Sequence, residues 1–161
     1  MIPPESWIVF FEWCEATAPG RWVRESIWAF GVIEAVHLTA LCVMGGALIL
    51  VDLRMLGFGM KDQEIGELAR HVRPWLVAGV ALMLSTGVLL FLSEAIKCFY
   101  NTSFWVKMTT LPFALLFTFA VRERRSLIEG LQTSGKSRVL GSVSMVLWFT
   151  VAAAGRWIGF S

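Results

Sequence analysis

The chain has 161 residues, of which 57% are hydrophobic and 16% are charged, and its formal net charge is +2. The mean hydropathy is +0.67. Since a soluble domain carries about 25% charged residues, this composition excludes an ordinary soluble domain and predicts an integral membrane protein. The small net charge, without a basic run interleaved with aromatic residues, argues against nucleic-acid binding. The length fits one domain over residues 1–161.

The N-terminal segment predicts a short helix that lies in the membrane interface. Its first residues (MIPPESW) are acidic and lack a cleavage-site pattern, so we expect no removable signal peptide. Residues 5–16 mix four large aromatic side chains with three glutamates, which is typical of an interfacial helix. Residues 17–20 (TAPG) are expected to end this helix.

Four apolar segments follow, at residues 27–51, 74–94, 104–121 and 139–158. At about 1.5 Å per residue, such segments can cross about 30 Å of hydrocarbon, the third with help from its flanking residues. The predicted fold is an all-α integral membrane four-helix bundle. Apolar residues recur at helical spacing over residues 65–72, which predicts an amphipathic helix on the cytoplasmic face that runs into span two. Residues 122–131 are expected to extend span three as a helix.

The distribution of lysine and arginine predicts the orientation. The connections after spans one and three carry nine of these residues, whereas the two tails and the middle connection carry five. Because cytoplasmic loops are enriched in lysine and arginine, we predict that both termini lie outside the cytoplasm.

Five ionisable residues fall in the outer half of this bundle. Glu34 and His37 lie three residues apart inside span one, and such groups are costly in lipid unless they face protein or a cavity. Glu94, Lys107 and Arg156 are expected at similar depth. The five predict either a ligand, proton or redox site or a buried ion-pair network that fixes helix register.

His37 has three interpretations: a hydrogen-bonded core residue, a haem ligand or a metal ligand. His71 is expected about 20 Å away along the bundle axis, so the two histidines cannot share one metal. Met83 lies near the depth of His37 and is a candidate axial haem ligand or a packing residue. A mononuclear metal site from His37, Glu34 and Glu94 is also compatible with the spacing.

The three cysteines divide by position. Cys42 is expected to pack inside span one. Cys14 and Cys98 both fall on the predicted outer face, where they either form a disulfide or remain free.

Several short motifs in order resemble an uncharacterised bacterial family of four-span membrane proteins, over residues 26–158. They are IEAVHL (33–38), VDLR (51–54), RPW (73–75), TG (86–87), SFWVK (103–107) and AGRWI (154–158). More distantly, the pattern is similar to HemJ-type protoporphyrinogen oxidases and CopD copper-resistance proteins. That resemblance implies a haem ligand at His37 and matches Lys107 to the span-three lysine of those proteins. The further span-three histidine of those haem proteins has no counterpart in residues 111–121. The resemblance to a bacterial family implies the bacterial inner membrane, so both termini are expected in the periplasm.

The predicted function is therefore that of a membrane protein with a buried Glu/His site, redox-linked through b-type haem or quinone and active in electron transfer. Lys107 and Arg156 would stabilise negative charge on a reduced quinone or a haem propionate. Two alternatives stay open: a non-catalytic accessory subunit of a larger membrane complex, and a metal-ion handling protein. The expected partners are the lipid bilayer and other membrane subunits or a second copy. No catalytic residue is assigned.

Overall fold

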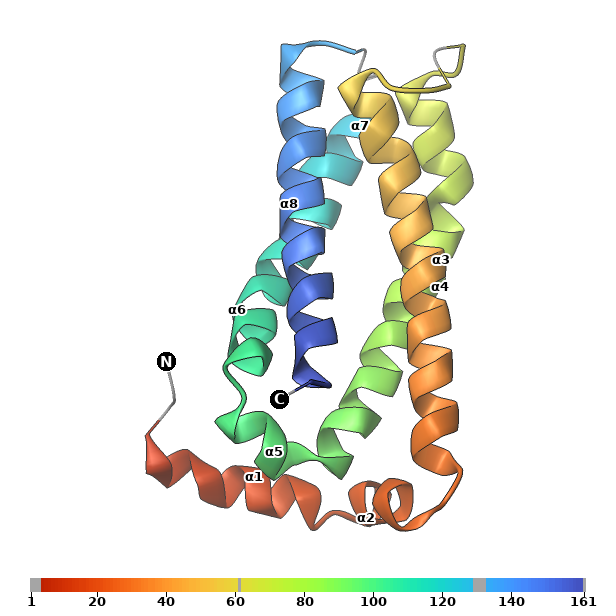
Figure 1. Ribbon diagram of the computed structural model, residues 1–161. Coiled ribbons are helices and arrows are strands. Elements are labelled where there is room, and N and C mark those ends of the chain that lie inside the picture. Colours follow the sequence, from red (N-terminus) through yellow and green to blue (C-terminus); the bar gives the residue numbers. More distant parts are fainter. Residues whose placement is uncertain (1–3, 61, 129–132, 161) are drawn as a thin grey trace.

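The computed structural model describes residues 4–60, 62–128 and 133–160. Four long helical rods run side by side, and a bent N-terminal arm lies across one end of them (Figure 1). The rods are α3 (Ala29–Leu56), α4 (Ile65–Ser93), Thr102–Leu127 and α8 (Gly135–Ile158), each long and apolar enough to cross a membrane. These described ranges contain no strand. The predicted all-α membrane bundle is thus confirmed.

The N-terminal arm consists of a 3-10 turn η1 (Glu5–Trp7) and two short helices, α1 (Ile8–Glu15) and α2 (Ala18–Glu25). Residues 17–20 end α1 as predicted. They also begin α2, which was not predicted, because Pro19 stands in the first turn of α2, where a helix needs no N–H donor.

Glu15 connects the N-terminal arm to the bundle through a hydrogen bond. Its carboxylate accepts a hydrogen bond from the backbone N–H of Ile96 at 2.8 Å and pairs with Arg24 at 2.9 Å. Ile96 belongs to α5 (Ala95–Tyr100), the short helix that follows α4. At Gly20 the two backbones are so close that a Cβ would come within 2.4 Å of the Leu92 carbonyl oxygen. The arm is therefore docked on the α4–α5 corner.

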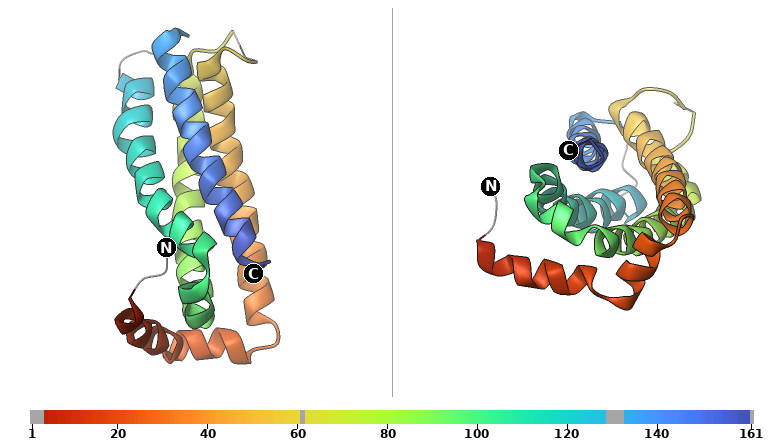
Figure 2. Two further views of the ribbon diagram at one scale, coloured as in Figure 1. Left: turned by 60° about the vertical axis from the view of Figure 1, so that its left-hand side comes forward. Right: turned by 60° about the horizontal axis from the view of Figure 1, so that its bottom comes forward.

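Helix α3 packs against α4 and α8, and α8 packs against α6 (Thr102–Leu116). Figure 2 shows the four rods from two further sides. Apolar side chains from all four rods form the middle of the bundle. They are Met44, Ala47, Leu48, Leu76, Val80, Ala114, Trp148 and Val151.

The connection between spans one and two is shorter than the sequence suggests. Gly57 ends α3 with a φ of +90°, and the Phe58 N–H returns to the Leu53 carbonyl at 2.9 Å, the hydrogen bond of a glycine C-cap. The amphipathic segment expected at residues 65–72 is helical and runs into span two as expected, since it is the first part of α4. Helix α4 continues through Pro74 without a break.

The third rod (Thr102–Leu127) changes from α-helix to π-helix along its length. Asn101 begins α6 by accepting hydrogen bonds from the backbone N–H groups of Ser103 and Phe104. After Leu116 the chain forms a π-helix, η2 (Phe117–Glu123), and then α7 (Arg124–Ile128). The expected helical extension of span three is confirmed as far as residue 128. Residues 129–131 lie outside the described residues.

Candidate functional site

His37 lies half-buried on α3 and faces α4. Its Nδ1 is 2.8 Å from the hydroxyl oxygen of Thr86, and that hydroxyl also lies 2.6 Å from the carbonyl oxygen of Leu82. A threonine hydroxyl has a single proton, and Thr86 donates it to Leu82. Thr86 therefore accepts a hydrogen bond from Nδ1–H, which leaves the Nε2 lone pair of a neutral His37 available. Metal-ligating and proton-accepting histidines are commonly oriented in this way.

Lys107 enters the same region from α6. It is half-buried, and its charge is close enough to His37 for the two side chains to interact. Among the residues that the structure describes, Lys107 has no hydrogen-bond or ion-pair partner. A lysine at this depth without a carboxylate partner is costly in lipid.

Two glycines make room for these side chains. A Cβ at Gly87 would come within 3.3 Å of the His37 ring, and a Cβ at Gly155 would come within 3.3 Å of the Lys107 Nζ. The first glycine belongs to the TG motif of α4 and the second to the AGRWI motif of α8. Both motifs thus border the His37–Lys107 site, as we call this region from here on.

The structure does not bring Glu34 to His37. Glu34 is exposed and makes no hydrogen bond or ion pair with any part of the chain that is described. The expectation that it lines the bundle interior is wrong, because residues three apart on a helix point about 60° apart and only the His37 direction meets α4.

The side chains of Glu94 and Arg156 make their contacts with residues outside the His37–Lys107 site. Glu94 is 3.7 Å from Lys97 in an exposed pair, and the exposed Arg156 stacks over the Phe160 ring at 4.1 Å. Met83 packs against the apolar core. The described ranges contain no group of three or more histidine, cysteine, aspartate or glutamate side chains arranged to hold a metal ion. The candidate metal residues His37, Glu34 and Glu94 are thus not gathered into one site.

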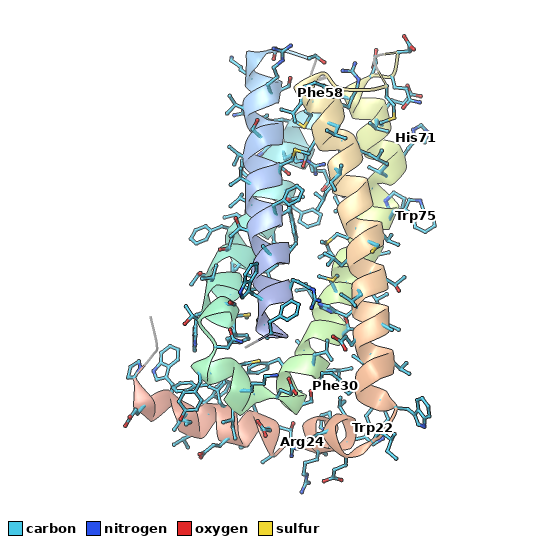
Figure 3. All side chains as sticks on the ribbon, in the orientation of Figure 1. Trp22, Arg24, Phe30, Phe58, His71 and Trp75 are labelled. Carbon is cyan, nitrogen blue, oxygen red and sulfur yellow. The ribbon has the colours of Figure 1, made fainter. Side chains whose placement is uncertain are left out.

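His71 is remote from His37, as expected. Its Nδ1 is 3.0 Å from the Glu67 carbonyl oxygen at the exposed start of α4, and its ring points away from the bundle (Figure 3).

A second polar region, which the sequence analysis missed, lies near the opposite end of the bundle. Asp52 on α3 pairs with Arg122 on η2 at 2.7 Å, and their side chains are only 2% and 3% exposed. The Arg122 guanidinium also reaches the Leu48 carbonyl at 3.4 Å. The neighbouring Glu123 pairs with Arg73 on α4 at 2.5 Å. These two ion pairs join α3, α4 and η2.

Ser144 of α8 is completely buried beside Asp52. Its hydroxyl makes no hydrogen bond within the described ranges. In the sequence, Asp52 follows the apolar residues of span one and Arg122 follows those of span three. Both therefore look like ordinary charged residues at the end of a span. The VDLR motif could have indicated this region, because it places a carboxylate one turn before the end of α3.

The cysteines are free in the structure. Cys14 and Cys98 are both buried in one aromatic cluster with Phe11, Phe99 and Phe104. Burial, with a smaller effect of Glu94, raises the pKa of the Cys98 thiol to about 11, so it remains protonated and poorly nucleophilic at neutral pH. Cys42 is exposed on α3 rather than packed inside the bundle.

Comparison with known proteins identifies a family and no function. No curated protein and no solved structure matches the chain. Nothing in these comparisons links it to the HemJ-type or CopD proteins. A family model described as a family of unknown function (DUF6644) matches residues 10–161, and the chain belongs to that family.

Proposed function

We propose that this multi-pass membrane protein binds a quinone at the His37–Lys107 site. The observation that carries the proposal is the Thr86 hydrogen bond, which orients the imidazole and leaves Nε2 as an acceptor. The ammonium group of Lys107 provides donors beside it. An oriented acceptor next to a cation, set inside apolar helices, suits a lipid-soluble ligand with polar oxygens.

The donors and acceptors match both redox states of a quinone. The oxidised ring has carbonyl oxygens, which accept hydrogen bonds from an ammonium group such as that of Lys107. The reduced ring has hydroxyl groups, which donate to an acceptor such as His37 Nε2. A ligand oxygen would also give Lys107 the polar partner that it does not find among the described side chains.

Haem is the second candidate, because the same Nε2 lone pair could ligate the iron of a haem. The residues present fit this group only in part. Met83 packs into the core, and the described helices bring no other histidine to His37. His37 would hold the iron, and Lys107 would lie near a propionate.

Two measurements on one sample of purified protein distinguish quinone from haem. We expect organic extraction of protein purified in mild detergent to release stoichiometric quinone, and the dithionite-reduced minus oxidised spectrum to show no haem bands. His37→Ala and Lys107→Met should lose most of the quinone. His71→Ala is the matched control and should retain it, because His71 is exposed near the start of α4 and remote from His37.

Two other results would change the proposed ligand or exclude one. A Soret band that disappears in His37→Ala but not in His71→Ala would replace quinone by haem. Absence of both quinone and haem from a folded wild-type sample would overturn the proposal and favour the accessory-subunit interpretation. Thermal unfolding of each variant, measured alongside, shows whether a lost ligand reflects a lost fold.

A further inference from the structure

An open groove runs along α4 near the end of the bundle opposite the N-terminal arm. It is lined by Arg70, Arg73, Pro74, Val77 and Leu127 and has a volume of about 560 Å³. Two of these side chains carry positive charge and three are apolar. The groove is separate from the His37–Lys107 site, so a ligand bound in it is independent of the proposed function.

The position of the groove along α4 matches the boundary of the hydrocarbon. Helix α4 has 29 residues, and its length of about 43 Å exceeds the roughly 30 Å hydrocarbon core. The part from Pro74 to Ser93 is long enough to fill that core, which leaves Arg70 and Arg73 at headgroup level. Trp75, 64% exposed, points outward at this level (Figure 3), as interfacial aromatic residues do.

The two arginines that line the groove, together with the glutamate that pairs with one of them, carry a net charge of +1. Arg73 pairs through Nε with Glu123, whose side chain is 8% exposed. This pair holds the guanidinium in place and leaves its terminal amino groups free to bind another group. Arg70 is exposed and has no ion-pair partner within the described ranges. Glu67, one turn before Arg70, does not line the groove.

We propose that this groove binds one anionic phospholipid. Guanidinium groups form paired hydrogen bonds with phosphate oxygens, and Arg70 and Arg73 present two of them at headgroup level. An acyl chain would lie along Pro74 and Val77, which continue from these arginines toward the middle of the bundle. A lipid with a single negative charge matches the net positive charge of the groove. Basic pockets beside membrane helices commonly recognise such headgroups.

The test measures lipid retention on the full chain purified in detergent. We expect native mass spectrometry to show one phosphatidylglycerol bound in preference to phosphatidylcholine. Arg70→Gln should weaken this binding about fivefold, the usual effect of one basic residue near anionic lipid. Arg125→Gln is the matched control, because it removes the same charge from an exposed position at the same end, outside the groove.

A second variant tests the apolar part. Val77→Trp leaves every charge in place but fills the path of the acyl chain, so it should also reduce phosphatidylglycerol retention. Glycerol phosphate, which has the headgroup chemistry without the chains, should compete weakly. Equal retention of phosphatidylcholine, equal losses in Arg70→Gln and Arg125→Gln, or full competition by glycerol phosphate would each overturn the proposal.

Discussion

At the scale of single residues, one hydroxyl group sets the chemistry of His37. Thr86 lies on the helix face that meets α3, and its own proton goes to the Leu82 carbonyl one turn earlier. The oxygen can then serve the imidazole only as an acceptor. His37 is thereby held in one orientation and in the Nδ1–H tautomer, with its Nε2 lone pair available. In the opposite tautomer Nε2 would carry the proton, and in a freely rotating ring the lone pair would have no fixed direction.

Thr86→Val tests this assignment, because it removes the acceptor while keeping the β-branched shape. We expect ¹⁵N NMR of labelled histidine to show the Nδ1–H tautomer for His37 in the wild type and a mixture in the variant. The free energy of unfolding should fall by about 1 kcal/mol, the usual effect of one lost hydrogen bond. The His71 signal should not change. A wild-type His37 in the Nε2–H tautomer would contradict the assignment.

The residue scale also shows what could be predicted from the sequence. His37 and Lys107 were identified because ionisable groups are rare inside apolar spans, and that rule requires no knowledge of helix rotation. The direction in which Glu34 points, in contrast, cannot be predicted without knowing how α3 is rotated about its axis. His37 faces α4, whereas Glu34 lies about 60° from it around the helix axis and is exposed.

At the scale of elements, the π-helix η2 adds a second reason why the contacts of the second polar region were not predicted. A π-helix has more residues per turn than an α-helix, so side chains after Phe117 no longer follow the period of 3.6 on which sequence analysis depends. Within this segment Arg122 meets Asp52 on α3 and Glu123 meets Arg73 on α4. The presence of four long apolar helices in the described part of the chain could be predicted from apolar length, whereas this rotation could not.

The Asp52–Arg122 pair should be important for stability because it is almost fully buried. Asp52→Asn leaves the Arg122 charge without its partner, and loss of one member of a buried pair costs about 3–5 kcal/mol. Thermal unfolding in detergent measures the change. The double variant Asp52→Leu, Arg122→Met should lose much less, because no unpaired charge remains.

Glu94→Gln is the control for this experiment. Its pair with Lys97 is exposed and 3.7 Å long, and exposed pairs contribute about 1 kcal/mol or less. If Asp52→Asn unfolds at the same temperature as Glu94→Gln, the buried pair does not stabilise the bundle.

At the scale of the whole molecule, an apolar core separates the two polar regions. The His37–Lys107 site lies toward the N-terminal arm, the Asp52–Arg122 pair lies toward the opposite end, and the side chains around Met44 and Trp148 fill the space between them. Both described ends of the chain lie at the arm end of the bundle (Figure 1). The orientation of the molecule therefore decides which side of the membrane is nearer to the His37–Lys107 site.

We predict that the arm end faces the periplasm, because the connections at the opposite end carry nine of the 14 lysines and arginines. Asp62 in the first connection and Thr102 at the start of α6 are both exposed and carry no positive charge, so cysteine at either position leaves this count unchanged. In a Cys42→Ala background, a membrane-impermeant maleimide added to intact bacterial cells should label Thr102→Cys and spare Asp62→Cys. Cell lysis should make both reactive, since each side chain is exposed. Labelling of Asp62→Cys alone in intact cells would reverse the orientation and place the His37–Lys107 site in the cytoplasmic half of the membrane.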